Sequence, residues 1–199
     1  LEFPGKPGNL AQWVEQLASV PLICQPGSQW NYSVATDVLG RLVEVWSGQE
    51  LAVFFRERIF GPLGMTDTAF AVAPEQQQRF AALYAPLSGG DMSSVGSKSS
   101  PTVDAPRGGL KLMESSLNSS YFKQPKLCSG GGGLTGSIGD YAKFCQMLLT
   151  GGELNGARLL SPTTVNFMRL NQLPDGQDMA AMGQPVWSET SYDGVGFGL

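Results

Sequence analysis

Apolar residues recur every three or four positions in several stretches of this chain, the pattern of helices that bury one face. The first stretch, residues 9–20, starts at Asn9, a residue type that caps helices, and ends before Pro21. The second, residues 34–46, carries apolar residues on two adjacent stripes and stops at Gly48. An apolar arc of that width predicts a helix buried over most of its circumference.

A third helix is predicted over residues 50–59, because its charged residues suit solvent and its large apolar residues share one side. The inward residues are Leu51, Phe54, Phe55 and Ile59. Closely spaced glycines in residues 60–65 then predict a tight connection, and residues 66–72 form a candidate short strand.

Helical patterns return in the last third of the chain. Ser137 and Asp140 match the S-x-x-D capping box, and the helix that follows aligns four apolar residues, Ile138, Tyr141, Cys145 and Leu148. An Asn-Gly pair inside residues 154–160 predicts a small hairpin, and a Ser-Pro pair opens another helix over residues 161–170.

The composition between these helical parts changes to Ser, Gly, Pro, Asp and Asn. Such a segment predicts a long surface excursion, with one short strand around residues 109–112. The chain therefore divides into a helical part over 1–86, a loop-rich excursion over 87–129 and a helical return over 130–199. The return ends in a glycine-rich, strand-like stretch that resembles a sheet strand cut short.

The charge balance excludes several kinds of partner. A net charge of −4 argues against nucleic acid or an anionic membrane, because both bind basic faces. No apolar run approaches the roughly 20 residues of a membrane span. The first residues, Leu1 to Pro4, show neither an initiator methionine nor a signal-peptide pattern, so they have the character of mid-chain sequence. The compartment, cytoplasmic or periplasmic, is left open.

No metal or cofactor is predicted. The three cysteines, Cys24, Cys128 and Cys145, are widely spaced and form no C-x-x-C pair, which indicates free core thiols. The glycine run at residues 130–133 lacks the Lys-Ser/Thr that completes a phosphate-binding P-loop.

The chain contains no histidine. This composition excludes the Ser-His-Asp triad, the Cys-His dyad, HExxH zinc sites and imidazole bases within these residues. A general base in this chain has to be a tyrosine, a lysine or a carboxylate.

Residues 26–33 offer such a group in a fixed position. Pro26-Gly27 predicts a turn, and Trp30 and Tyr32 then alternate with polar residues as in a short extended segment. Ser33 is a natural cap for the following helix. Tyr32 is therefore expected at a loop-to-helix junction, where its phenol can face a cleft.

Five stretches carry a resemblance to a known family. Residues 26–33, with the Pro-Gly-x-x-Trp-x-Tyr-Ser pattern, and the helix ending at Gly48 are followed by IFGPLGMTDT over residues 59–68. The runs GGGLTGSIGDYAKF over 131–144 and LLSPTTV over 159–165 follow in the same order. Together they resemble the serine β-lactamase-like hydrolases, and among them the carboxylesterases related to class C β-lactamases.

This resemblance implies a fold and an active site. Such enzymes combine an α/β domain with a mainly helical domain, so this chain would be the helical-domain portion, mainly α with short strands. They use a nucleophilic serine in S-x-x-K, a Tyr-x-Asn or Ser-x-Asn element and a K-T-G or W-G-G-like strand. Tyr32, Ser33 and Val34 match the second element, which implies Tyr32 as general base. By the same resemblance Ser33, Val34, Gly131, Gly132 and Gly133 contact substrate.

The residue types at this element favour esters over lactams. A phenol ionises near pH 10, so the chemistry places a lysine beside it to favour phenolate. Val34 replaces the asparagine of class C lactamases and cannot donate to a substrate amide carbonyl. For an arbitrary tyrosine, a buried phenol bonded to a backbone carbonyl is the ordinary role, and that alternative stays open for Tyr32.

The S-x-x-K and K-T-G elements of the family are not found at the expected positions of this chain. One S-x-x-K sequence exists, Ser120 to Lys123, but it follows the tyrosine element and lies in the loop-rich excursion, two residues before Pro125. Leu134-Thr135-Gly136 lacks the lysine of K-T-G. Both are interpreted as chance matches.

We therefore expect this chain to be a part of a serine hydrolase that cleaves or transfers carboxylic esters through an acyl-enzyme. These residues alone are expected to be inactive, because the nucleophile is missing. The partners expected are a small ester or lactam and the missing remainder of the parent fold, with no nucleic acid and no membrane span. The alternatives are a β-lactamase or D-Ala-D-Ala peptidase-like protein, or a non-catalytic binding module.

Overall fold

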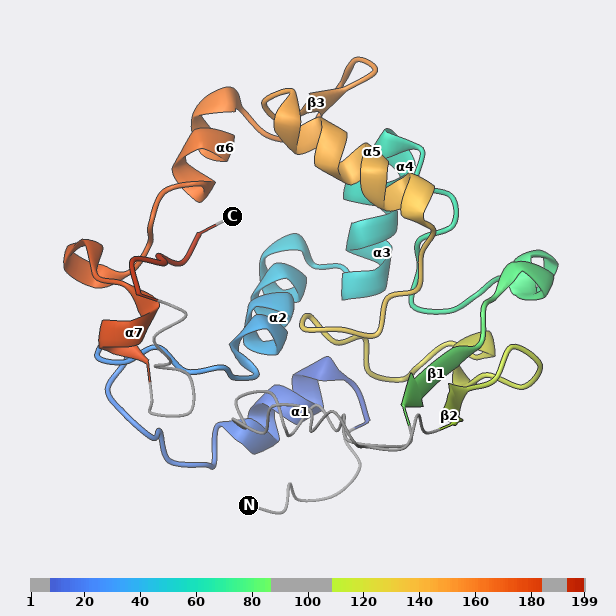
Figure 1. Ribbon diagram of the computed structural model, residues 1–199, viewed down its shortest axis with the longest axis horizontal. Coiled ribbons are helices and arrows are strands. Elements are labelled where there is room, and N and C mark those ends of the chain that lie inside the picture. Colours follow the sequence, from blue (N-terminus) through green and yellow to red (C-terminus); the bar gives the residue numbers. More distant parts are fainter. Residues whose placement is uncertain (1–7, 87–108, 184–192, 199) are drawn as a thin grey trace.

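The computed structural model describes residues 8–86, 109–183 and 193–198, and their regular structure is mainly helical (Figure 1). The α-helices are α1 (Leu10–Leu17), α2 (Ala35–Ser47), α3 (Leu51–Phe55), α4 (Gly61–Leu63), α5 (Ile138–Leu149), α6 (Pro162–Met168) and α7 (Met179–Met182). A π-helix, η1 (Arg56–Phe60), joins α3 to α4, and 3₁₀ turns are η2 (Pro74–Arg79), η4 (Ser120–Phe122) and η5 (Pro174–Gly176). The strands are β1 (Leu83–Pro86), β2 (Leu110–Glu114), β3 (Glu153–Leu154) and β4 (Ala157–Arg158).

The predicted helix ends are largely confirmed. Asn9 caps α1 in a reciprocal box with Gln12, and Gly48 closes α2 at a φ of 69°, a left-handed conformation that suits glycine. Ser161 caps α6 by accepting the Thr164 N–H at 3.0 Å. The predicted third helix exists, but its second half, η1, is wound as a π-helix rather than an α-helix.

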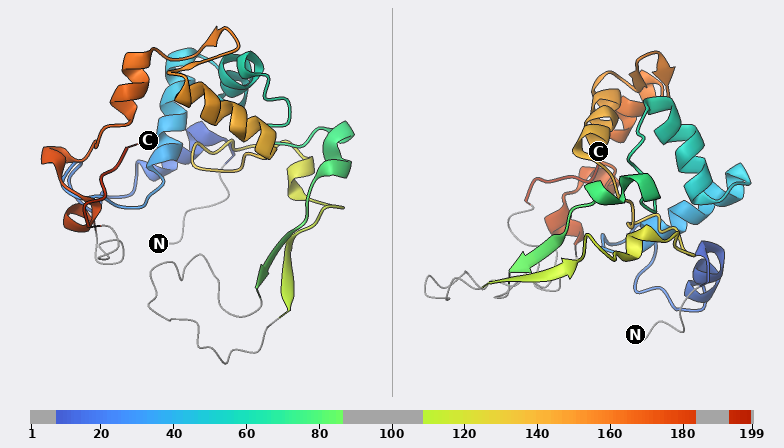
Figure 2. Two further views of the ribbon diagram at one scale, coloured as in Figure 1. Left: turned by 45° about the horizontal axis from the view of Figure 1, so that its top comes forward. Right: turned by 90° about the vertical axis from the view of Figure 1, so that its right-hand side faces the viewer.

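Strands are short and come in antiparallel pairs. β1 pairs with β2 and forms a ribbon that extends away from the helices (Figure 2), and β3 pairs with β4 across the predicted Asn-Gly turn. The strand expected around residues 109–112 is therefore confirmed as β2. The strand expected over residues 66–72 is wrong: only Ala69 pairs there, in an isolated bridge to Thr135.

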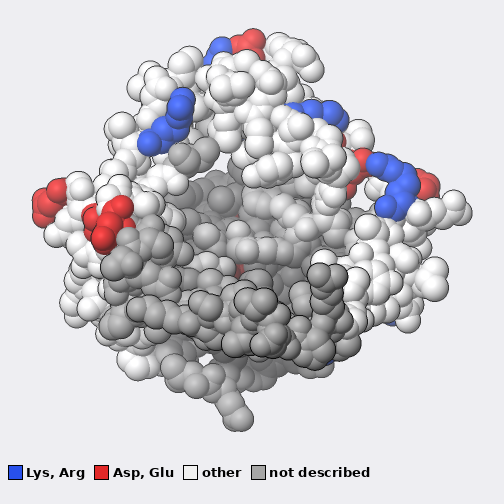
Figure 3. All heavy atoms as spheres, in the orientation of Figure 1, with Lys and Arg blue, Asp and Glu red and all other residues white. Residues whose placement is uncertain are grey.

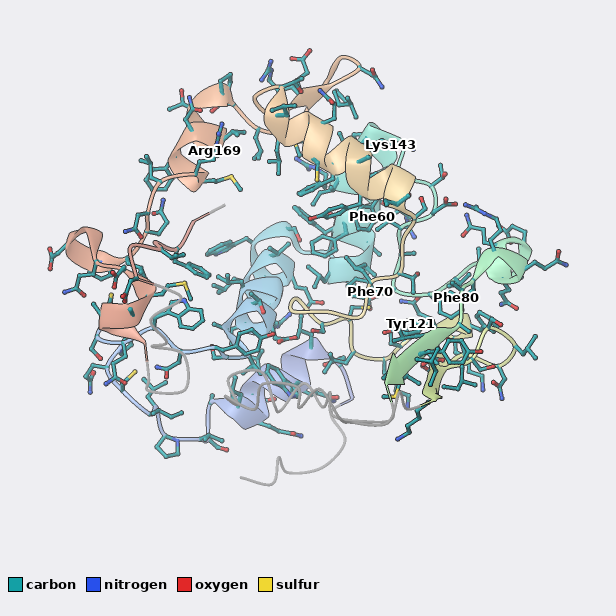
Figure 4. The ribbon with its side chains drawn as sticks, in the orientation of Figure 1. Phe60, Phe70, Phe80, Tyr121, Lys143 and Arg169 are labelled. Carbon is teal, nitrogen blue, oxygen red and sulfur yellow. The ribbon has the colours of Figure 1, made fainter. Side chains whose placement is uncertain are left out.

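Phe55 joins the two parts of the apolar core. One part consists of Phe60, Leu63, Met65 and Met147, and the other of Leu10, Leu51 and Phe70. The Phe55 ring stacks on Phe70 at 6.1 Å and meets Phe60 edge-on at 5.8 Å. Phe60 and Phe70 lie on the stretch between α3 and α5 in Figure 4, so this core holds α1, α3, α4 and α5 together.

The prediction that α2 is buried over most of its circumference is wrong. Gly40 is the one residue of this helix that is fully buried, whereas Leu39 and Trp46 are 58% and 78% exposed. Gly40 is buried because α3 and the glycine loop lie against it: a Cβ there would come within 3.0 Å of Leu51 and 3.2 Å of the Gly130 Cα. The wide apolar arc thus includes a side with no cover among the described residues.

The start of α5 differs from a simple capping box. Ser137 caps it as predicted, accepting the Asp140 N–H at 3.3 Å. The Asp140 carboxylate instead reaches across the chain, where it accepts the Asp67 N–H at 2.7 Å and the Thr68 hydroxyl at 3.0 Å. Asp140 is consequently 2% exposed, and it joins residues 67–68 to α5.

The glycine-rich segment 193–198 lies beside residues 171–179 and adds no strand to a sheet in the described structure. The Gln172 N–H donates to the Phe197 carbonyl at 2.7 Å, and the Met179 N–H donates to the Val195 carbonyl at 2.8 Å. The hydrogen bond from Gly194 lowers the pKa of the Asp178 carboxyl, as does that from Ala181. The predicted sheet strand is not observed in the described part of this segment.

None of the helices in the described ranges is both long enough and apolar enough to cross a membrane.

Candidate functional site

The loop that carries Tyr32 is fixed by its neighbour Trp30. The Trp30 N–H donates to the Met182 carbonyl at 2.9 Å, beside a parallel bridge to Gly183. The Trp30 ring packs at 5.7 Å from the ring of Phe197. Helix α7 and the C-terminal segment, both distant in sequence, therefore hold the loop from one side.

Tyr32 follows this anchor and is 70% exposed. The next residue, Ser33, accepts the Ala35 N–H at 3.2 Å, so its hydroxyl binds the first residue of α2. The prediction that Ser33 is itself the N-cap is wrong, because it lies one position before the cap. Val34 occupies the formal cap position and contributes no side-chain hydrogen bond to the helix. The phenol thus lies at a loop-to-helix junction on the surface of the described structure.

The glycine loop packs against the same end of α2. The Ser129 hydroxyl donates to the Asp37 carboxylate at 2.5 Å and accepts the Gly131 N–H at 3.0 Å. A Cβ on Gly130 would lie far inside contact distance of the Thr36 carbonyl, and one on Gly131 would lie 2.7 Å from the Thr36 hydroxyl. Close approach to α2 is therefore the reason for glycine at these two positions.

Two of the predicted site segments are brought together in this way. Tyr32, Ser33 and Val34 lead into α2, and Gly131 lies against the first turn of that helix. Gly132 has open space around it, and Gly133 adopts a φ of 85° next to Phe70. Their roles in substrate binding stay predictions, as does the role of Tyr32 as a base.

The Ser129–Asp37 hydrogen bond was not predicted from the sequence. From the sequence, Asp37 is an ordinary acidic residue in the first turn of a helix, where the helix dipole stabilises its negative charge. The signal available was a serine directly before a glycine run, and only the fold pairs it with an acid 92 positions away.

A pocket of about 630 Å³ lies elsewhere, between the β1–β2 ribbon and the start of α5. The Arg79 guanidinium binds Asp67 through two contacts of 2.8 Å and holds the pKa of that carboxyl at about 2, below its ordinary 3.8. Tyr32 and the glycines 131–133 are not among the residues that line this pocket. It is therefore separate from the predicted catalytic element.

The S-x-x-K sequence at Ser120 lies far from Tyr32. Ser120 starts the single turn η4, and Lys123 leaves it with extended backbone at φ −126° and ψ 138°. Tyr121 packs beside Phe80 next to the ribbon (Figure 4), whereas Trp30 contacts α7 on the opposite side of the molecule (Figures 1 and 2). The geometry agrees with a chance match.

The charged residues that the structure describes form no patch of one sign on the face drawn in Figure 3. On the face drawn in Figure 3, the described Lys, Arg, Asp and Glu side chains lie mostly around the rim, with both signs mixed. Among the described residues no three His, Cys, Asp or Glu side chains gather as metal ligands.

Comparison with known proteins gives the family. The Beta-lactamase family model matches residues 1–198, and the chain belongs to this family. Its members related to this chain are serine hydrolases and include esterases.

Individual relatives are longer than this chain. Protein Rv1367c of Mycobacterium tuberculosis is 36% identical over 188 residues, which are 94% of this chain and 41% of that protein. Esterase EstB of Burkholderia gladioli is 36% identical over 140 residues, 70% of this chain and 34% of EstB. The chain therefore spans about two fifths of the length of the first of these relatives and about a third of the second.

A solved structure supports the fold. Simvastatin Synthase (LovD) from Aspergillus terreus superimposes with a TM-score of 0.61 at 27% identity, over 83% of this chain and 37% of that one. The chain thus has the fold of a portion of a Beta-lactamase-family protein.

Proposed function

We propose that this chain is the tyrosine-bearing part of a serine hydrolase that cleaves or transfers carboxylic esters through an acyl-enzyme, with Tyr32 as general base. The observation that carries the proposal is the placement of Tyr32, exposed at a loop-to-helix junction fixed by Trp30 and Ser33, within a family whose members include esterases. A base on a rigid support holds its geometry through the reaction.

In the proposed reaction the nucleophile comes from an S-x-x-K element outside these residues. The Tyr32 phenolate accepts the proton of the attacking serine as the serine Oγ adds to the ester carbonyl. The same phenol then returns that proton to the leaving alkoxide, which departs as alcohol and leaves the acyl-serine. Water, or another alcohol in a transfer reaction, repeats the sequence and frees the acid or the new ester.

Val34 supports esters over lactams as substrates. A valine side chain has no group that donates to an amide carbonyl, whereas an ester needs no such contact to be cleaved. β-Lactamase or D-Ala-D-Ala peptidase-like activity remains the second candidate, since the family takes its name from lactam hydrolysis. A chromogenic cephalosporin assayed beside a p-nitrophenyl ester separates the two candidates.

The test is Tyr32→Phe in the complete polypeptide encoded by the gene that contains this chain. Ester turnover is expected to fall at least about a hundredfold, the scale of a lost general base. Tyr84→Phe is the matched control, because Tyr84 is also exposed but lies on the β1–β2 ribbon. Turnover within a few fold of normal in Tyr32→Phe would refute the assignment.

The non-catalytic alternative is tested on the 199-residue chain itself. A fluorophosphonate probe is expected to leave it unlabelled, while labelling the complete polypeptide at one serine. Stoichiometric labelling of the chain at Ser120 would contradict the proposed division of the active site. An unlabelled complete polypeptide would favour a binding module.

A further inference from the structure

Helix α5 carries apolar residues on two opposite sides. One side packs on the chain's own core through Phe144 and Met147. The other side presents five uncharged residues, called here the α5 stripe: Ile138, Tyr141, Ala142, Cys145 and Leu149, all exposed. Ile138 is 89% exposed and Leu149 is 78% exposed.

The two charged residues of α5 lie toward the side that packs on the chain, whereas the polar Gln146 is exposed. Asp140 is buried, and Lys143 donates to it at 3.0 Å and also binds the Gly64 carbonyl. Both charged residues of the helix therefore lie on the side that packs. A surface helix ordinarily places its charges in solvent and its apolar stripe in the core. In α5 the side without charges meets solvent.

Helix α2 has the same inverted arrangement. Leu39 and Trp46, seven positions apart, share one exposed side. The charged residues lie opposite and bind within the chain: Asp37 accepts from Ser129, and Glu44 binds both Arg41 and the Leu51 N–H at 3.1 Å. We call the side with Leu39 and Trp46 the α2 stripe.

Two helices with this inversion define a surface that needs cover. Exposed apolar residues scattered singly are normal, but residues aligned along a whole helix side are typical of an interface. In Figure 1, the C-terminal segment ends between α6 and α2, with α5 above α2 in the view. Three further exposed residues add to the apolar surface of these elements: Phe167 in α6, Leu170 just after α6, and Phe197.

We propose that the α5 stripe and the α2 stripe bind an apolar helix of the polypeptide that completes the hydrolase. The identity of this occupant rests on the proposed function. Its existence is supported by length, because the region matching this chain is 41% of Protein Rv1367c and 37% of LovD, so most of each relative lies outside the match. Uncharged stripes select a helix with an apolar face and disfavour an acidic or basic segment.

Cys145 reports on this surface without any mutation. It lies in the middle of the α5 stripe and is exposed, whereas Cys24 and Cys128 are half-buried. In the 199-residue chain a maleimide is expected to modify Cys145 readily. In the complete polypeptide the same thiol is expected to react at least about tenfold more slowly, because the occupant covers it.

Two results would overturn the proposal. Equal reaction rates at Cys145 in both polypeptides, located by peptide mass mapping, would show that the α5 stripe stays open. Slow reaction in the 199-residue chain, with sedimentation as a dimer, would make a second copy the occupant.

A substitution tests the energetic role of the stripe. Leu149→Asp is expected to lower the unfolding temperature of the complete polypeptide by at least about 4 °C, because it places a charge in the interface. The same substitution is expected to leave the 199-residue chain unchanged, since Leu149 is exposed there. Leu117→Asp is the matched control, a similarly exposed leucine on the loop after β2. No shift in the complete polypeptide would contradict the proposal.

These readouts are independent of catalysis. Neither thiol protection nor the unfolding temperature requires ester turnover, and Tyr32→Phe is expected to leave both unchanged. Near-normal ester turnover in Tyr32→Phe, together with a protected Cys145, would reject the proposed function alone. An exposed Cys145 with a hundredfold loss in Tyr32→Phe would reject the docking surface alone.

Discussion

Asp67 is the residue whose titration carries the clearest consequence for stability. It binds Arg79 through both carboxylate oxygens, and its N–H donates to Asp140. The contacts with Arg79, and then with Ser137, hold its pKa at about 2 against an ordinary 3.8. The folded state therefore holds fewer protons at this group than the unfolded state does between these two values.

From this difference we predict an acid-dependent loss of stability. The contribution of Asp67 is complete above about pH 4 and is lost as pH falls toward 2, because folded Asp67 titrates below its unfolded value. Urea unfolding at several pH values in this window measures the slope. Asp67→Asn is expected to flatten it, whereas Asp175→Asn, at an exposed turn, is expected to leave it unchanged. Identical slopes for both variants would contradict the prediction.

Tyr32 shows what a single residue in a motif reveals. Its position after Pro26-Gly27 and just before a helix was predictable from turn and capping chemistry, and the structure places it there, with Val34 rather than Ser33 at the cap position. Trp30 fixes the loop, but the sequence around it does not indicate which residues it contacts. Met182 and Phe197 lie more than 150 positions away, and only the fold brings them to it.

At the scale of elements, the glycine loop is shaped by its contact with α2. Gly130 is expected to be intolerant of a side chain, because a Cβ would collide with the Thr36 backbone carbonyl, which cannot move aside as a flexible side chain would. Gly130→Ala is predicted to lower the free energy of unfolding by about 1–3 kcal/mol, the usual cost of overpacking.

Gly132→Ala is the matched control for this prediction. Gly132 lies two positions along the same loop, a Cβ added to it would meet no atom within 4 Å, and its backbone does not require a positive φ. The effect of this substitution is expected to stay below about 1 kcal/mol. Chemical denaturation of both variants measures the difference, and equal losses would show that the contact with Thr36 is not the cause.

At the scale of the whole molecule, Asp140 connects segments more than 70 positions apart. It accepts from the Asp67 N–H and the Thr68 hydroxyl while its own helix, α5, packs on Phe60 and Met65. Asp140→Ala is predicted to lower the free energy of unfolding by about 2–4 kcal/mol, because it leaves buried donors without an acceptor. Asp140→Asn keeps one acceptor oxygen and is expected to lose less. Equal losses, measured by denaturant unfolding, would contradict this account.

The sequence by itself determined the local structure of this protein and its family. Helix starts at Asn9, Ser137 and Ser161, the stop at Gly48 and the Asn-Gly hairpin follow from side chains within a few positions of one another. The order of motifs identified the family because residue types and their spacing are local features of the chain.

Only the tertiary structure decided which faces are covered. Hydrophobic spacing predicts that a side of a helix will be buried, but not against what. The same pattern therefore packs in α3 and stays exposed on α2 and α5. The pairing of Asp37 with Ser129, and of Asp140 with residues 67–68, joins positions too distant for any local signal. Such contacts are a property of the folded chain, because no stretch of a few residues contains both partners.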